Sequence, residues 1–220
     1  LSTNGLADAP TGRPDTIADI RSLGFVQLDT IQVVSRAHHH ILWSRNQNYR
    51  EPVLDRLLGK ERAVFEHFTH DASVLPIEFL PMWKRQFRRM KEKVSRSSWY
   101  GKVLDADILR TVRDKIEKEG PLSTHAFDTK TKGPKKMWSR PPHKLALDYM
   151  WYAGELATSH RVNFTKFYDL AERVFPPNPS VSPLDDQGQI DWLCHAAMDR
   201  MGFGAPGDVQ RFWAATTSAE

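Results

Sequence analysis

Apolar residues recur at helical spacing in short stretches of the chain, and proline or glycine separates one stretch from the next. Residues 15–23 predict a short helix that Pro14 precedes and Gly24 ends. Residues 105–120 predict a longer helix, because Asp105 can cap its N-terminus and the apolar positions after it form one stripe. The pattern therefore predicts a mainly helical protein built from short units.

Two stretches alternate between apolar and polar residues, and this alternation is typical of β-hairpins. They cover residues 63–76 and 156–170. Residues 25–34 alternate only in part and also suit a helix, so the pattern leaves their state open. Pro76 is expected to open a long basic helix that reaches about Lys93. We therefore expect a mainly α fold with small β-hairpins, that is, an α+β fold.

The order of elements after residue 101 is typical of a winged-helix domain. A helix is followed by a short helix from Pro121, a third helix from about His143, and the second hairpin. The third helix of that fold normally enters the major groove of DNA, although a buried helix fits its many apolar residues almost as well. We predict tandem winged-helix domains: a first over 1–100, a second over 101–178 and the start of a truncated third over 181–220. The third ends after two helices and the chain opens on leucine, so we expect a fragment of something longer.

Positive charge is concentrated in two strips of the sequence. Residues 82–102 hold eight Lys or Arg and one Glu, and residues 130–144 hold six Lys or Arg and no acid, whereas the whole chain carries a formal net charge of only +4. Both strips contain tryptophan. Such strips bind phosphate backbones through counterion release, although a solvated helix face is the plainer alternative for either strip. The candidate DNA-binding residues are Arg85, Arg88, Arg89, Lys135, Lys136, Trp138, Arg140, His143 and Lys144.

Composition excludes several classes of protein. With 40% hydrophobic and 26% charged residues, the chain is typical of an ordinary globular protein. No apolar run approaches the ~18 to 20 residues of a membrane-spanning helix, and the first residues lack the layout of a signal peptide. The single Cys194 excludes an intramolecular disulfide and leaves a structural zinc site without its usual thiolates. We expect a cytoplasmic protein with no metal, no cofactor and no membrane contact.

Several segments together resemble one enzyme family, the bacterial tandem winged-helix DNA glycosylases of the AlkZ/YcaQ kind. These segments are LGFVQLDTIQVVSRAHHHILWSR at 23–45, NYREPVLDRLL at 48–58, FEHFTHDASVLP at 65–76, PPHKLALDYMWYAGEL at 141–156 and RVNFTKFYDLAERVFP at 161–176. The resemblance covers most of residues 14–213. It implies winged-helix modules in a C-shaped arrangement with a β-barrel. The family's N-terminal helix, the rest of its third winged helix and its barrel have no counterpart in this sequence.

The resemblance also implies an activity and a catalytic signature. The family excises bulky alkylated or interstrand-crosslinked purines, and its signature is Gln, an apolar residue, then Gln or Asp. Here the signature stands as Gln27-Leu28-Asp29, which resembles the crosslink-repair branch. We therefore expect a monofunctional DNA repair glycosylase that binds double-stranded DNA containing alkylated or crosslinked purines, acts as a monomer without cofactor, and is associated with the nucleoid in the cytoplasm.

The two polar residues of the signature suit this chemistry. An N7-alkylated purine leaves as a cationic base, so strong protonation of the leaving group is unnecessary. Asp29 can accept a proton from water and stabilise an oxocarbenium-like sugar, while Gln27 can orient that water. If residues 27–29 are extended, both side chains point to one face, whereas in a helix they diverge by about 200°. The alternative is that Asp29 only caps a helix that begins at Thr30.

Other candidates have plainer explanations. His38, His39 and His40 suggest a metal site, yet no carboxylate lies within the next ten residues. His70 is a candidate substrate-side residue that Asp71 could orient, although a turn between two strands explains the pair as well.

A different class of function also fits the order of elements, namely a non-catalytic winged-helix regulator of transcription. A regulator would carry Arg, Asn or Gln on its recognition helix in order to read base edges. Residues 143–156 contain none of these three. That absence favours recognition of backbone and shape, which suits a repair enzyme.

Overall fold

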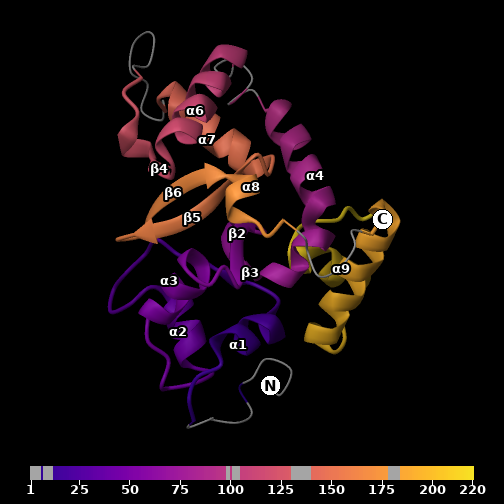
Figure 1. The fold of residues 1–220 in the computed structure, drawn as a ribbon. Helices are drawn as coiled ribbons and strands as arrows, with labels where there is room; N and C mark the ends of the chain where they lie inside the picture. The colour runs from indigo at the N-terminus through magenta and orange to yellow at the C-terminus, as the bar shows by residue number, and fades with distance from the viewer. Residues whose placement is uncertain (1–5, 7–11, 98–99, 101–104, 130–139, 178–183) are drawn as a thin grey trace. The chain divides into compact units, whose positions relative to one another are not determined.

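The structure is a computed structural model that describes residues 6, 12–97, 100, 105–129, 140–177 and 184–220. The chain forms two compact units: unit 1 comprises residues 1–85 and 178–220, and unit 2 comprises residues 86–177. Helices predominate, and the strands of the described residues form two three-stranded antiparallel sheets (Figure 1). The predicted α+β class is therefore confirmed, while the division into three winged-helix domains stays a prediction. No helix in the described ranges is long and apolar enough to cross a membrane.

Unit 1 begins with a helix, a very short strand, two helices and a hairpin. The sheet has the order β1-β3-β2, so the two-residue strand β1 lies beside the second strand of the hairpin. The hairpin predicted over 63–76 is confirmed. The elements are α1 (Thr16–Leu23), β1 (Val26–Gln27), α2 (Ala37–Trp43), α3 (Pro52–Gly59), β2 (Val64–Phe68) and β3 (Ala72–Pro76).

The predicted helix over 15–23 is confirmed as α1, together with both of its ends. Oδ1 of Asp15 accepts a hydrogen bond from the Ala18 amide at 3.1 Å, which caps the N-terminus. Gly24 ends the helix with φ +86°, a conformation that favours glycine. A Cβ added to Gly24 would lie 2.6 Å from the ring of Trp213, so this turn is also closely packed.

Two helices from the end of the chain complete unit 1. They are α9 (Asp186–Met201) and α10 (Pro206–Trp213), and Oε1 of Gln189 in α9 accepts from the Arg85 amide at 2.8 Å within unit 1. Trp213 is buried, and its Nε1 donates to the Leu193 carbonyl at 2.8 Å. Nη2 of Arg200 donates to the Arg21 carbonyl at 2.7 Å, at the end of α1. The C-terminal helices therefore pack against α1 as part of one core.

One sequence expectation for this part of the chain needs correction, and one assignment that was left open is resolved. The long helix expected from Pro76 begins instead as a 3₁₀ helix, η2 (Ile77–Trp83), and becomes α-helical only in α4 (Lys84–Ser95). Pro81 explains this, because it lacks the N–H that an α-helical turn would use. Residues 25–34, which suited strand and helix alike, form only β1 and then an irregular segment that lasts until α2.

Unit 2 has the same kind of order, with a hairpin at its end. The helix over 105–120 and the hairpin over 156–170 are confirmed. The short helix expected from Pro121 is replaced by a two-residue strand, which pairs with β6, and a 3₁₀ turn. The elements are α6 (Ala106–Glu119), β4 (Leu122–Ser123), η3 (Thr124–Ala126), α7 (Pro142–Tyr152), β5 (Leu156–Val162), β6 (Thr165–Leu170) and α8 (Ala171–Val174).

Helix α7 lies in the core of unit 2. Every one of its residues is buried or half-buried. Trp151 donates through Nε1 to Oγ1 of Thr158 at 3.1 Å, and the Lys166 ammonium lies 3.5 Å from the centre of the Trp151 ring. Of the two sequence interpretations of this segment, the buried helix therefore describes the structure better than an exposed recognition helix.

Candidate active site

The signature Gln27-Leu28-Asp29 lies at the end of β1 in an extended conformation. Gln27 pairs with Ser73 in β3, and the Leu28 amide donates to the Ala72 carbonyl at 2.8 Å, so the ladder continues beyond the strand. Leu28 is buried, Gln27 is exposed and Asp29 is half-buried. The alternation of an extended chain therefore turns both polar side chains to the same outer face, as the chemistry of the signature requires. The helix that Asp29 could have capped at Thr30 does not form.

Asp29 is fixed through its backbone and its side chain. Its amide donates to Nδ1 of His38 at 3.2 Å, and its Oδ1 accepts from the Ile31 amide at 2.8 Å. His38 is buried on α2 and must carry its ring proton on Nε2, because Nδ1 accepts. No hydrogen bond within the described ranges uses Oδ2 of Asp29. This oxygen is therefore available to a water or a substrate.

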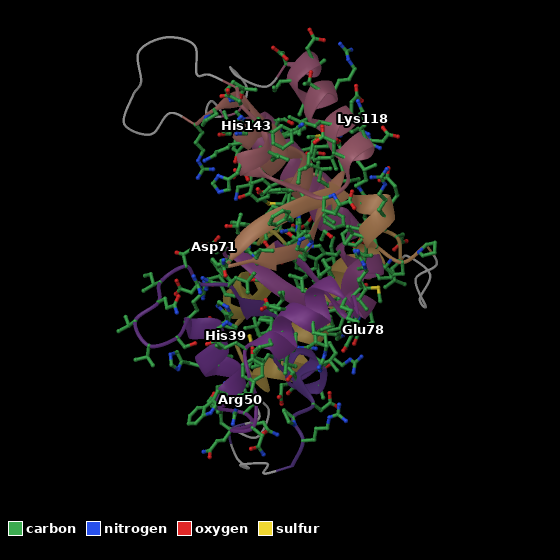
Figure 2. All side chains as sticks on the ribbon, turned by 60° about the vertical axis from the view of Figure 1, so that its left-hand side comes forward. His39, Arg50, Asp71, Glu78, Lys118 and His143 are labelled. Carbon is green, nitrogen blue, oxygen red and sulfur yellow. The ribbon has the colours of Figure 1, made fainter. Side chains whose placement is uncertain are left out.

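A pocket of about 440 Å³ opens beside the segment that follows Asp29. Its lining combines aromatic rings with one guanidinium and one carboxylate, and Figure 2 labels His39 and Arg50 toward the same edge of unit 1. Pockets with apolar walls and a few placed polar groups are typical of ligand sites. The lining residues are Ser35, His39, His40, Trp43, Tyr49, Arg50 and Glu51.

His39 connects this pocket with the residues around Asp29. Its ring centre lies 4.1 Å from that of His38, and its Nδ1 lies 2.9 Å from the Tyr49 hydroxyl. Glu51 accepts from the Ser35 hydroxyl at 2.5 Å and lies 3.6 Å from Nε2 of His39. Burial lowers the pKa of His39, while the hydrogen bond from Ser35 lowers the pKa of Glu51. At neutral pH the pocket therefore holds a neutral imidazole beside a carboxylate.

The sequence interpretation missed this pocket. Tyr49 and Glu51 precede the first helical proline, Pro52, and give no periodic signal of their own. Their approach to His39 depends on how α3 packs beside α2, and the sequence pattern does not contain that information. The only signal was that NYREPVLDRLL belongs to the segments that carry the family resemblance.

A comparison with known families decides the identity of the fold and its chemistry. A family model described as DNA glycosylase AlkZ-like matches residues 20–220. The chain belongs to the AlkZ-like DNA glycosylase family. It is therefore a DNA repair glycosylase, a hydrolase of N-glycosyl bonds whose substrate is DNA. No solved structure matches the chain.

The three adjacent histidines of this AlkZ-like chain face three different partners. They lie on the helix α2. Among the described residues, no three His, Cys, Asp or Glu side chains are arranged so that they could hold one metal ion. His38 faces the backbone of Asp29, His39 faces Tyr49, and His40 donates to the Ser35 carbonyl at 3.2 Å. They organise the surroundings of Asp29 and of the pocket.

His70 and Asp71 form the turn between β2 and β3 of the AlkZ-like unit 1. Oδ1 of Asp71 accepts from the amide of Ala72 at 2.7 Å, and Nε2 of His70 donates to the Phe212 carbonyl at 3.2 Å. The bond of Asp71 is local and explains the turn, while the bond of His70 ties the turn to α10. A substrate-side role for His70 stays a prediction.

Arg85, one of the predicted phosphate contacts, binds other residues of unit 1 through its side chain. Its side chain is only 12% exposed, donates to the Ala215 carbonyl at 3.0 Å and forms an ion pair with Glu220. These contacts hold the Arg85 guanidinium against residues 215 and 220 of unit 1, and its contact with phosphate stays a prediction. On α4, Arg88 is exposed, while Arg89 is half-buried and donates to the Gln86 side chain at 3.2 Å.

The second basic strip divides between surface and core. Arg140 is exposed and donates to Asp148 at 2.8 Å, and Lys144 is half-buried. His143 is buried, stacks on Phe127 and lies 2.6 Å from the Thr129 hydroxyl, and burial lowers its pKa. This histidine lies in the core of unit 2, and its contact with DNA stays a prediction. Lys135, Lys136 and Trp138 lie outside the described residues.

Proposed function

We propose that this AlkZ-like chain hydrolyses the N-glycosidic bond of bulky N7-alkylated purines or of interstrand crosslinks in double-stranded DNA. The observation that carries the proposal is the geometry of one short segment: Gln27 and Asp29 share the outer face of β1, and Leu28 between them is buried. A carboxylate and an amide on one face can act on the same sugar.

The leaving group decides how much catalytic machinery is needed. An N7-alkylated purine is cationic while it is attached to the sugar, so the bond breaks without a strong general acid. What the reaction needs is negative charge near the developing oxocarbenium ion and one oriented water. The surface around β1 offers both.

Asp29 and Gln27 have distinct roles in this mechanism. Oδ1 of Asp29 holds the Ile31 amide, so Oδ2 accepts the proton of the attacking water while the carboxylate stabilises the cationic sugar. Gln27 has one donor and one acceptor group, and it orients that water without taking its proton. Neither residue has an amine that could form a Schiff base with the sugar, which supports a monofunctional glycosylase.

The remaining residues of the proposal bind the duplex. We propose that both units are winged-helix modules, because each follows the order helix, short strand, helices and hairpin. Arg88, Arg89, Arg140 and Lys144 then contact phosphates, which position DNA without reading its sequence. The buried state of α7 argues for contact with backbone and shape. We propose that the chain acts as a monomer.

The test is single-turnover release of N7-alkylguanine from duplex DNA by the wild type and by Asp29→Asn. Asparagine keeps an oxygen that can accept from the Ile31 amide, so the variant removes the charge and preserves the turn. We expect a loss of about 10² to 10⁴ in rate with unchanged DNA binding, the range for removal of a positioned base.

Asp15→Asn is the matched control, because Asp15 is another Asp of unit 1 whose Oδ1 accepts from a nearby backbone amide. It should release base at the wild-type rate. Salt-sensitive DNA binding with no base release by the wild type would instead favour the non-catalytic DNA-binding protein. Equal rates for wild type and Asp29→Asn would move the chemistry away from Asp29.

A further inference from the structure

Three apolar side chains stand in solvent immediately after Asp29. Ile31, Val33 and Val34 are 70%, 89% and 85% exposed. Single exposed apolar residues are ordinary, but three within four positions form a patch. We call residues 31–34 the apolar tip. Its exposure is a cost to the isolated protein unless a partner covers it.

The apolar tip is held in place at both ends. Oδ1 of Asp29 accepts from the Ile31 amide at 2.8 Å, and Gln32 bridges to Arg36 in antiparallel fashion. Beyond the tip, the Ser35 hydroxyl donates to Glu51 and the Ser35 carbonyl accepts from His40. The tip is thus a short anchored turn whose apolar side chains are directed away from the core.

The position and charge of the tip indicate what covers it. One of its anchors is the proposed catalytic carboxylate, so whatever contacts the tip lies next to the reacting sugar. Residues 29–51 hold three arginines against two acidic residues, Asp29 and Glu51, and this excess of positive charge suits a polyanion. β-Branched side chains cannot bind phosphates, and the largest apolar surface that DNA offers is the faces of its stacked bases.

We infer that the apolar tip inserts between stacked bases beside the damaged nucleotide and opens the stack for hydrolysis. Apolar wedges of this kind unstack a base step in other DNA-binding proteins, and enzymes that act on a base must separate it from its neighbours. The inference rests on the proposed function, because it places the reaction at Asp29. It adds a residue set that acts on DNA structure without touching the bond that breaks.

The experiment separates unstacking from catalysis. A duplex carries 2-aminopurine, which fluoresces when it is unstacked, next to a stable abasic-site analogue, so no base release is required. The full chain is compared with Val33→Ser/Val34→Ser and with the matched control Phe203→Ser, which removes another apolar side chain of unit 1 that is 88% exposed. All three substituted side chains are solvent-exposed, and circular dichroism verifies that each variant is folded.

We expect saturating wild type and Phe203→Ser to raise the fluorescence and the double variant to lose most of that rise. Release of N7-alkylguanine by the double variant should fall about tenfold or more on duplex DNA and remain unchanged on single strands, where no paired stack has to be opened. Sedimentation of each protein alone shows whether a second copy covers the tip.

The outcomes distinguish the two proposals. A fluorescence rise that depends on the tip, without base release from any substrate, supports the wedge and overturns the glycosylase chemistry at Asp29. Normal base release with equal fluorescence for wild type and double variant overturns the wedge and leaves the proposed function. Self-association of the wild type that the double variant abolishes, with unchanged fluorescence, assigns the tip to a second copy and also overturns the wedge.

Discussion

Units 1 and 2 follow the same course and differ where the first strand ends. In both units, a capped helix ends at a glycine and is followed by a two-residue strand. This strand pairs with the second strand of the hairpin, β3 in unit 1 and β6 in unit 2. After β1 the chain remains extended and presents Gln27 and Asp29. After β4 it turns at once, because Ser123 is buried and its hydroxyl accepts from the His125 amide at 3.3 Å. The same scaffold therefore offers outward-facing polar groups in one unit and a closed turn in the other.

The glycines before β1 and β4 differ in how closely other residues of their unit pack against them. Gly24 and Gly120 have φ values of +86° and +85° at equivalent places. A Cβ at Gly24 would meet Trp213 and Arg200, whereas nothing described lies within 4 Å of a Cβ at Gly120. Unit 1 is thus closed at this corner by residues from the end of the chain, and unit 2 is open there.

The largest expected effect concerns the buried tryptophans. Trp83 donates to Nδ1 of the buried His67 at 2.9 Å, and Trp151 donates to the Thr158 hydroxyl. Trp83→Phe leaves a buried ring nitrogen without this donor and should lower the free energy of unfolding by about 3 kcal/mol. Trp151→Phe should cost about half as much, because the Thr158 hydroxyl can rotate. Urea unfolding measures the free energy of unfolding of each variant, and hydrogen exchange shows which unit has lost stability. Equal losses for Trp83→Phe and Trp151→Phe would contradict this prediction.

The next effect separates the two strand ends by activity. Gln27→Ala should reduce single-turnover base release about a hundredfold, because the attacking water loses its orientation. Ser123→Ala, at the equivalent position of β4, should leave the rate unchanged and lower the stability of unit 2 by about 1 kcal/mol through the lost cap. If both variants lose activity alike, the outer face of β1 has no special role.

A smaller effect tests the two glycines. Gly120→Ala should cost about 1 to 2 kcal/mol, because φ +85° with ψ −155° is a conformation that side chains rarely adopt. Gly24→Ala should cost roughly 2 kcal/mol or more, because the new methyl group also displaces Trp213. Thermal unfolding followed by tryptophan fluorescence compares them, and a larger loss for Gly120→Ala would show that packing at Gly24 is relaxed.

The smallest effect concerns pH. Burial lowers the pKa of His39 in unit 1 and of His143 in unit 2. The folded protein then binds fewer protons than the unfolded chain just below the ordinary histidine pKa of about 6.5, so stability is greatest above that pH and falls as pH drops through it.

Glu51 distinguishes the two histidines, because its carboxylate raises the pKa of His39, whereas the carboxylate that raises the pKa of His143 is that of Asp128. The other charged groups acting on His39 are Asp55, Arg36 and His40. Glu51→Gln should therefore lower the pKa of His39 further and leave that of His143 in place. NMR titration of the ring protons measures both, and a shift at His143 would mean that the variant disturbs the fold.

Elements whose signals are local could be predicted from the sequence. Asp105 and Gly120 bound the helix α6 because a cap and a left-handed glycine act within a few residues. The two hairpins follow from alternation and turn residues in the same way. The state of residues 25–34 could not be predicted, because it depends on Val26 pairing with Val74, far along the chain. Strand β4 was missed for the same reason, since its partner is β6.

The site was predictable only in part. The family resemblance of the Gln-apolar-Asp pattern indicated Gln27 and Asp29 as candidate site residues. An extended conformation of residues 27–29 predicted that both side chains share one face. Charge patterning did not reveal the internal partners of Arg85, because Glu220 and Ala215 are more than a hundred residues away. It did not reveal the burial of His143 either, because a histidine beside lysine in sequence can still stack on Phe127. The charge of a sequence segment does not reveal which of its side chains are buried or paired within the folded protein.

The interrupted path of unit 1 has a consequence for protein synthesis. Unit 2 is one continuous stretch, residues 86–177, whereas unit 1 needs residues from both sides of it. A chain leaving the ribosome folds in order of emergence, so unit 2 can close while Gly24 still lacks Trp213. We expect unit 1 to be completed after unit 2, once Trp213 has emerged. A chain cut within α9 should therefore retain a folded unit 2 and lose the packing that supports β1.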